Sequence, residues 1–283
     1  MDNNFLDDFN KKHYLQLIMD CESEEAKQYM TNSVPDTLIK FYSLQDENGC
    51  CKNQILNNRK LNTLIDGNLY LSDADKMNDP FEYEGVYIDY KSIEHNAPQY
   101  LEMVKIFDYL IKEIHKLTSF CDKSANTPAM WAYYTNNHQG FYIEYKINNK
   151  RLFNRVLYEN ERSHIWKTVI SLLSQDKKEE NFLKPEIMQV MDLIRHRFFI
   201  KHDSWEHEKE FRLVTDCKNQ KNKNIYSFKE MDVKPIKVVC GLKCSDKNIK
   251  KLKKFASKFN IPIYKTKMSE NDFSLVEIEI KQQ

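Results

Sequence analysis

The chain has 283 residues, of which 41% are hydrophobic and 30% are charged, a composition typical of a folded globular protein and not of a disordered or fibrous one. Its 43 basic and 42 acidic residues give a formal net charge of +1, so no overall field draws the molecule to nucleic acid or to a membrane surface. With only 5 glycines, and with neither of the glycine-rich phosphate motifs, the sequence argues against folds that hold nucleotides in such loops.

Features tied to cellular location indicate the cytoplasm. The first residues carry no apolar stretch of the kind found in secretion signals, and no apolar run approaches the ~20 residues of a membrane-spanning helix. The seven cysteines are an odd number and include the adjacent Cys50 and Cys51, which argues against a framework of disulfide bonds. We therefore expect a cytoplasmic protein without a membrane partner.

Hydrophobic spacing divides the chain into an N-terminal helical region over residues 1–36 and one α+β domain over residues 37–283. In the first part of this domain it predicts strands over 37–43, 69–72 and 117–121, helices over 52–66 and 99–117, and a turn over 76–80. Gly67 follows the first of these helices, as expected of a glycine at a helix C-terminus.

The second part of the domain begins with a strand over residues 140–147, where Phe141, Ile143 and Tyr145 alternate with Tyr142, Glu144 and Lys146. The spacing then predicts helices over 162–174, 185–199 and 245–259, the last capped by Ser245, and strands over 208–214, 236–240, 261–265 and 275–280. The expected fold class is α+β, a single domain in which helices cover a central mixed or antiparallel sheet, with helical insertions near residues 99–117 and 162–200.

The segment from Trp205 to Arg212 carries the most suggestive arrangement of charges. Alternate side chains of a strand point to the same face, so Glu208, Glu210 and Arg212 would lie in one row, roughly 7 Å apart. Two carboxylates held together in a cleft raise the pKa of one of them, which suits acid–base chemistry or the stabilisation of a cation. The alternative is a solvent-exposed face on which Arg212 neutralises a carboxylate, and the spacing alone favours this second interpretation.

Two further segments are candidates for lining a cleft. Asn78 and Asp79 precede a proline in a sequence typical of a turn, and such a turn could also carry Asp79 or Glu82 into the cleft. Trp131 and Tyr134 lie one helical turn apart. Rings at this spacing usually pack in a core, but they could equally form a stacking wall for a base or a nicotinamide.

Metal and nucleic-acid sites have less support. The cysteines and histidines lack the spacing of a metal site, so we expect no bound metal. Residues 246–258 form a lysine-rich helix face, which is most simply a solvated surface and alternatively a contact for a phosphate backbone. Asp122, Glu144 and Lys146 follow the order of acidic residues and lysine that is found in metal-dependent nucleases.

Several motifs, spread over roughly residues 37–245, together resemble a bacterial family catalogued as domain of unknown function 2971. The motifs that carry this resemblance are Lys40-Phe41-Tyr42-Ser43, Asn78 through Glu82, Trp131 with Tyr134 and Gly140, and Glu208 with Glu210 and Arg212. The resemblance is specific in the combination of the motifs, and it implies no particular activity.

The order of these motifs is also similar to that of ADP-ribosyltransferase folds. That resemblance implies a catalytic glutamate, Glu210 or Glu208, which stabilises the oxocarbenium-like transition state formed as the nicotinamide–ribose bond of NAD breaks. Lys40 stands where those enzymes carry His or Arg. The rings of Tyr42, Trp131 and Tyr134 are expected to line the pocket. The full set of residues expected to bind NAD is Lys40, Tyr42, Asn78, Asp79, Trp131, Tyr134 and Arg212.

The leading hypothesis is therefore an ADP-ribosyltransferase-like enzyme, a transferase or NAD glycohydrolase with NAD as its substrate, acting as a toxin or phage-defence effector. Two alternatives remain open. One is a metal-dependent nuclease built on Asp122, Glu144 and Lys146. The other is a non-catalytic module that binds a nucleotide, or binds nucleic acid through the lysine-rich face of residues 246–258.

Overall fold

The computed structural model describes residues 9–20, 22–47, 50–73, 76–77, 79, 81–162, 196–216 and 223–281. Within these residues nine strands form one sheet: β1 (Thr37–Tyr42), β3 (Ser72–Asp73), β4 (His115–Cys121), β5 (Phe141–Ile147), β6 (Phe153–Arg155), β9 (Glu210–Asp216), β11 (Val233–Cys240), β12 (Ile263–Met268) and β13 (Leu275–Glu279). Their order in space is β13-β12-β11-β5-β1-β4-β9-β6, with β3 paired to β4. Neighbours are antiparallel except β11 and β12, which are parallel.

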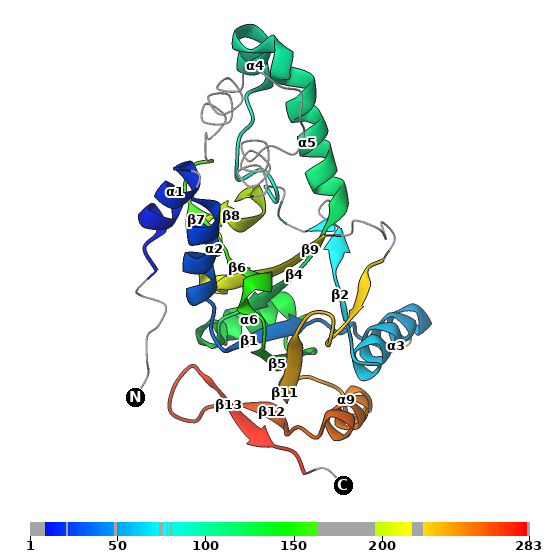
Figure 1. Cartoon of the computed structure of the whole chain (residues 1–283). Helices are drawn as coiled ribbons and strands as arrows, with labels where there is room; N and C mark the ends of the chain where they lie inside the picture. Colours follow the sequence, from blue (N-terminus) through cyan, green and yellow to red (C-terminus); the bar gives the residue numbers. More distant parts are fainter. Residues whose placement is uncertain are drawn as a thin grey trace.

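Helices and two short ribbons surround this sheet (Figure 1). The helices are α1 (Lys11–Met19), α2 (Ser23–Asn32), α3 (Cys51–Ile65), α4 (Tyr90–Asn96), α5 (Leu101–Ile114), α6 (Pro128–Tyr134) and α9 (Asp246–Phe259). One ribbon pairs β2 (Asn68–Tyr70) with β10 (Ile225–Ser227), and the other pairs β7 (Leu157–Glu159) with β8 (Ile200–His202). The predicted α+β class, with a mixed sheet and covering helices, is confirmed. None of the described helices has the length and apolar character that crossing a bilayer requires.

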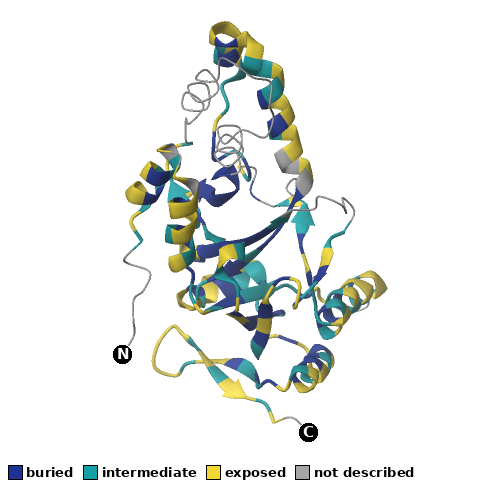
Figure 2. Ribbon diagram, viewed as in Figure 1, coloured by how far each residue is buried: buried dark blue, intermediate teal, exposed yellow. Residues whose placement is uncertain are grey.

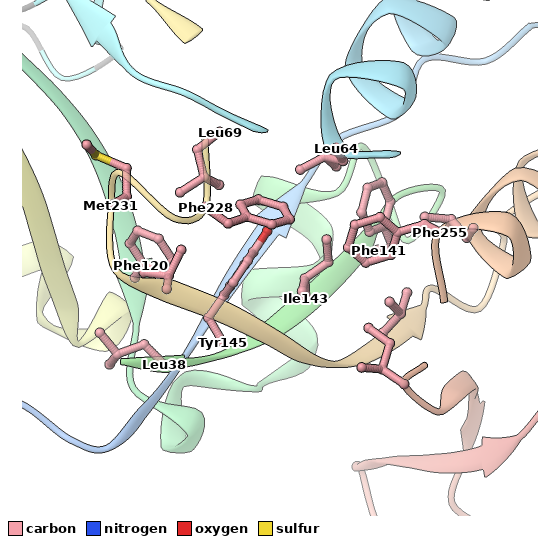
Figure 3. Packing of buried hydrophobic residues seen from close by; sticks show 14 of the residues in the cluster. Leu38, Leu64, Leu69, Phe120, Phe141, Ile143, Tyr145, Phe228, Met231 and Phe255 are labelled. Atoms are coloured by element: carbon pink, nitrogen blue, oxygen red, sulfur yellow. The ribbon is translucent and has the colours of Figure 1, made fainter. Parts of the chain in front are cut away.

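The main hydrophobic core lies on the face of the sheet that α3 and α9 cover. Leu38 of β1, Phe120 of β4 and Tyr145 of β5 project from three strands into this core, where the ring of Phe228 contacts those of Tyr145 and Phe255 (Figure 3). Full burial of one such apolar side chain stabilises the fold by about 1.5–3 kcal/mol. Figure 2 shows that buried residues concentrate on the central strands, while the outer sides of α3 and α9 are exposed.

Two smaller clusters lie elsewhere, one around β1, β5 and α6 and the other around α5, β4 and β9. Trp131 of α6 packs with Ile39 and Tyr142 in one of them. Phe107 of α5 packs with Phe198 in the other, which also contains Leu117 and Val214. The polar groups described below lie between these two apolar clusters.

The structure corrects the predicted bounds of several elements. The helix predicted over 99–117 ends at Ile114, because β4 already begins at His115. In β5 every residue except Lys146 is buried, because both faces of this central strand are covered. The helices predicted over 162–174 and 185–199 lie almost entirely outside the described residues. His196–Phe199, at the end of the second of these ranges, forms a short 3-10 helix, η5.

The strand predicted to begin at Glu208 begins at Glu210 instead. Glu208 is the last residue of a 3-10 helix, η6 (Asp203–Glu208), and Lys209 adopts a left-handed conformation with φ 45°. The chain changes direction at Lys209. Only Glu210 and Arg212 therefore share one face of β9, and Glu208 approaches them from a separate element.

Candidate functional site

A cavity of about 180 Å³ lies where β1, β4 and β9 meet α6, β8, η6 and the turn around Asp79. Leu117 and Met130 line it and belong one to each of the two small apolar clusters, which locates the cavity between them. Its charged lining residues are Lys40, Asp79, Glu82, Lys201, Glu208 and Glu210, and its aromatic lining residues are Phe41, Tyr134 and Trp205.

The sheet opens beside the cavity, and Lys40 occupies the opening. β1 pairs with β4 at Ile39 and Cys121, and continuing this antiparallel register would bring Phe41 opposite Ser119. The ammonium of Lys40 donates to the Ser119 carbonyl instead, at 2.8 Å. Lys40 thereby reaches the cavity, although strand alternation directs it to the same side of β1 as the residues of the main core.

Arg212 and two glutamates form the floor of the cavity. Arg212 is fully buried and binds Glu210 through two hydrogen bonds, from Nε to Oε1 at 2.8 Å and from Nη2 to Oε2 at 3.0 Å. The same guanidinium lies 2.9 Å from Oε1 and 2.8 Å from Oε2 of Glu82, and it donates to the Phe198 carbonyl. Pairing on both sides of one planar guanidinium holds the two carboxylates in fixed positions.

Lys201 connects this floor to the wall of the cavity. Its Nζ lies 2.7 Å from Glu208 Oε2, 3.5 Å from Glu210 Oε2 and 4.6 Å from the centroid of the Trp205 ring. The hydroxyl of Tyr134 donates to the other oxygen of Glu208. Glu208, only 3% exposed, is therefore a buried carboxylate held between a lysine and a tyrosine in the cavity wall.

The pKa values of the two carboxylates on the floor, Glu210 and Glu82, are shifted in opposite directions. Burial opposes the ionisation of Glu210, but the charges of Arg212 and Lys201, together with the hydrogen bond from Arg212, lower its pKa to about 2. Burial raises the pKa of Glu82 against the attraction of Arg212, and the charge of Glu210 raises it further. As the pH falls, Glu82 takes up a proton before Glu210 does.

Burial is also the largest cause of the pKa shifts of Lys40 and Cys121. It lowers the pKa of Lys40 to about 8. It raises the pKa of the Cys121 thiol, and the nearby charges of Glu210 and Glu208 act in the same direction. Cys121 is thus a protonated thiol at neutral pH, so its position in the lining does not make it a nucleophile.

With all groups ionised, negative charge exceeds positive charge around the cavity. Among the described residues, the four carboxylates of the site stand against the three cations Lys40, Lys201 and Arg212. The surplus of one negative charge in a partly desolvated site favours a ligand, or a transition state, that carries positive charge.

Most of the residues predicted for the site meet at this cavity. Those that line it are Lys40, Asp79, Tyr134, Glu208 and Glu210, and Arg212 lies beneath Glu210. The Asn78 prediction lies outside the described residues. The interpretation of Glu208, Glu210 and Arg212 as a solvated face is wrong, because all three side chains are buried.

Tyr42 and Trp131 do not line the cavity. Strand alternation turns Tyr42 to the main core, where its hydroxyl hydrogen-bonds that of Tyr145 at 2.8 Å and its ring stacks on Phe141. Trp131 is 0% exposed and its indole N–H donates to Asn126. The aromatic wall expected from these two residues is supplied by Phe41 and Trp205 instead.

Lys201 and Trp205 are the site residues that the sequence analysis missed. Lys201 lies in β8, a three-residue strand too short to give a periodic signal. Trp205 did carry a signal, because it begins the same charged segment as Glu208 and Glu210. Because the chain turns at Lys209, Trp205 and Glu208 approach the cavity from η6 and Glu210 approaches it from β9.

The residues of the nuclease hypothesis do not assemble into a metal site. Asp122 accepts hydrogen bonds from the backbone and hydroxyl of Ser124, Glu144 pairs with Lys123, and Lys146 is exposed. Within the described ranges, no group of three or more His, Cys, Asp or Glu residues is arranged to hold a metal ion. This arrangement gives the nuclease hypothesis no support.

The lysine-rich face of α9 is partly occupied by contacts within the chain. Lys247 pairs with Glu47 at 2.9 Å, and Lys251 donates to Asn58 of α3. The exposed Lys250, Lys254 and Lys258 continue the face into solvent. None of the residues of α9 lines the cavity.

Comparison with known proteins adds one finding. No curated protein and no solved structure matched the chain. The segment from α6 to β9 contains Tyr134, Lys201, Trp205, Glu208 and Glu210. This segment, residues 130–213, matches the model of the family described as "Protein of unknown function (DUF2971)", and the match supports the resemblance that the sequence motifs indicate.

Proposed function

We propose that the protein is an ADP-ribosyltransferase-like enzyme that binds NAD at this cavity and breaks the nicotinamide–ribose bond, as a transferase or as an NAD glycohydrolase. The observation that carries the proposal is the buried carboxylate of Glu208, which lines a ring-walled cavity between Lys201 and Tyr134. Loss of nicotinamide leaves positive charge on the ribose. A fixed carboxylate stabilises that charge without having to reorganise.

The charge of the cavity supports the same substrate class. The nicotinamide ring of NAD is a cation, and the described groups carry one negative charge more than they carry positive charges when all of them are ionised. Tyr134 and Trp205 contribute aromatic rings to the lining, and a flat cationic ring is attracted to such groups.

The size of the cavity limits how much of NAD it would enclose. Its volume of about 180 Å³ is below the ~300–1,000 Å³ of pockets that enclose a whole drug-sized ligand. We therefore expect the nicotinamide and its ribose to enter, and the adenosine part to remain outside.

The proposed reaction needs few groups. The carbon–nitrogen bond breaks with its electron pair moving to the ring nitrogen, which neutralises the nicotinamide, so no general acid is required. Water or an acceptor hydroxyl then forms the new carbon–oxygen bond and releases a proton to Glu208 or to solvent. Glu210 and Arg212 act as positioning residues, because their mutual pairing fixes the floor beneath Glu208 and Lys201.

Calorimetric titration with NAD, followed by chromatography for released nicotinamide, tests the proposal. We expect one NAD per chain for the wild type, and at least tenfold weaker binding for Trp205→Ala because an aromatic ring of the cavity lining is lost. Tyr133→Ala is the matched control, since Tyr133 lies beside Tyr134 on α6 but is 71% exposed and does not line the cavity. Absence of binding by the wild type, or equal binding by the Trp205 variant, contradicts the proposal.

An enzyme that depletes the NAD of a cell harms that cell, which fits a role as a toxin or phage-defence effector. This role predicts that the NAD content of cells falls when the wild type is expressed and is maintained when Glu208→Gln is expressed. An equal fall with both proteins contradicts it.

A further inference from the structure

Asp79 carries a buried hydrogen-bond acceptor that no described group satisfies. The residue is 8% exposed, and its Oδ2 atom has no hydrogen-bond partner in the described part of the chain. The other carboxylate oxygen, Oδ1, accepts the backbone N–H of Phe81 at 2.9 Å, and the Asp79 carbonyl accepts that of Glu82 at 3.0 Å. The turn thus uses one side of a carboxylate that lines the cavity and leaves the other side unpaired.

The cations of the cavity do not compensate this oxygen, because they are bound elsewhere. Arg212 pairs with Glu82 and Glu210, Lys201 pairs with Glu208, and Lys40 donates to the Ser119 carbonyl. A buried acceptor without a partner destabilises a protein, and the penalty is larger for a charged group than for a neutral one. A ligand that brings a donor to Oδ2 removes this penalty, so the unpaired oxygen favours the bound state.

We infer that Asp79 Oδ2 recognises a hydrogen-bond donor, an N–H or O–H group, on the ligand that enters the cavity. An anionic group is disfavoured at this point, because the carboxylate of Asp79 would repel it. The inference rests on the proposed function and specifies its substrate recognition. In NAD the donors at this end are the carboxamide of the nicotinamide and the hydroxyls of its ribose.

Asp79→Asn separates recognition from structure. Asparagine keeps an oxygen for the Phe81 N–H and replaces the unpaired oxygen by an NH₂ group, which cannot accept. The variant should bind donor-bearing ligands at least tenfold more weakly while its melting temperature stays equal or rises, because the buried acceptor oxygen without a partner has been removed. A purely structural role would lower the melting temperature instead.

Asp272→Asn is the matched control. Asp272 forms the same kind of turn, accepting the backbone N–H of Ser274 two residues on, but it is exposed and does not line the cavity. Its variant should bind every probe as the wild type does.

NMR titrations of the wild type and both variants with nicotinamide, N,N-dimethylnicotinamide and ADP-ribose complete the test. If the carboxamide is the donor, the wild type binds nicotinamide at least tenfold more tightly than the dimethyl compound, and Asp79→Asn abolishes the difference. If a ribose hydroxyl is the donor, Asp79→Asn weakens ADP-ribose at least tenfold. Unchanged binding of all probes by Asp79→Asn, or no binding of either donor probe to the wild type, overturns the inference.

The release of nicotinamide from NAD distinguishes this inference from the proposed function. Probe discrimination that depends on Asp79, without nicotinamide release, supports the recognition role and contradicts the proposed enzyme. Nicotinamide release with no dependence of binding on Asp79 gives the reverse conclusion.

Discussion

Glu208 and Glu210 lie two residues apart, yet their surroundings suit them to different tasks. Both oxygens of Glu210 are bound by the fully buried guanidinium of Arg212. Glu208 is held by the ends of two longer side chains, Lys201 and Tyr134, in the cavity wall. These contacts suit Glu208 to the chemistry in our proposal and Glu210 to the stability of the floor.

Substituting each glutamate should therefore have a different effect on stability. Glu210→Gln should lower the free energy of unfolding by about 3 kcal/mol, because it leaves Arg212 with an incompletely compensated buried charge. Glu208→Gln should lower it by about 1 kcal/mol, since Lys201 keeps its contacts with Glu210 and Glu82. Urea unfolding followed by circular dichroism measures both values. Equal losses for the two variants contradict this division of roles.

Lys40 should make the stability of the protein depend on alkaline pH. Burial lowers its pKa from 10.5 in the unfolded chain to about 8, so the folded protein binds the proton more weakly and is destabilised below pH 8. Between about pH 8 and 10.5 the unfolded chain keeps this proton while the folded protein releases it. The wild type should therefore gain stability over this range relative to Lys40→Met, by at most about 1.4 kcal/mol per pH unit.

The comparison of the two proteins isolates Lys40, because every other lysine and tyrosine titrates in both. Unfolding free energies measured from pH 7 to 10.5 give the difference curve. A flat difference would show that Lys40 has the same pKa in the folded and unfolded states.

At the scale of elements, β1 contacts its two neighbours in different ways. It pairs with β5 along its whole length, from Thr37 opposite Lys146 to Tyr42 opposite Phe141. On the other side it pairs with β4 at Ile39 and then separates from it, which admits Lys40 to the cavity. Pairing with β5 along the whole strand holds β1 in place, while the other edge of β1 separates from β4 after Ile39.

Gly140 should be intolerant of a side chain, because it precedes β5 where the chain crosses the end of β1. A Cβ atom at Gly140 would lie 2.0 Å from the Tyr42 carbonyl oxygen, a backbone atom that cannot rotate away. Gly140→Ala should therefore lower the free energy of unfolding by about 3 kcal/mol. Gly67→Ala is the comparison: Gly67 has φ +83° but an open environment, with Phe259 at 3.6 Å, so its loss should be about 1–2 kcal/mol. Chemical denaturation showing the reverse order contradicts this account.

Elements with a strong local signal were predictable from the sequence. Ser245 caps α9 by accepting the backbone N–H of Asn248, and the apolar stripe of this helix faces the core, as the helical spacing predicts. The strand at β5 was also predicted, but the burial of both its faces was not. The second face is buried because α6 packs against it, and the local pattern of β5 does not encode this tertiary contact.

The candidate site was predictable only where one short motif supplies the residue. Glu208 and Glu210 lie in one such motif. Lys201 lies outside it, in β8, and belongs to the site because it forms ion pairs with both glutamates. Tyr42 was expected at the pocket, beside Lys40, from the similarity to ADP-ribosyltransferase folds. The opening of the sheet beside Lys40 separates the two, and no local pattern encodes that opening.

At the scale of the whole molecule, charge is balanced globally and unbalanced locally. The formal net charge is +1, but the described cavity groups have one more carboxylate than cations. These groups come from segments as distant as Lys40 and Arg212, joined by one sheet and the elements that cover it (Figure 1). The local negative surplus is therefore a property of the fold rather than of the composition.

The initial rate of nicotinamide release from NAD, compared among three purified proteins, tests the proposed role of Glu208 most directly. Glu206→Gln is the matched control, because Glu206 lies on the same 3-10 helix, is exposed and does not line the cavity. We predict that the wild type and Glu206→Gln release nicotinamide at equal rates and that Glu208→Gln, folded by circular dichroism, is at least a hundredfold slower. No release by the wild type, or equal release by Glu208→Gln, would contradict the account.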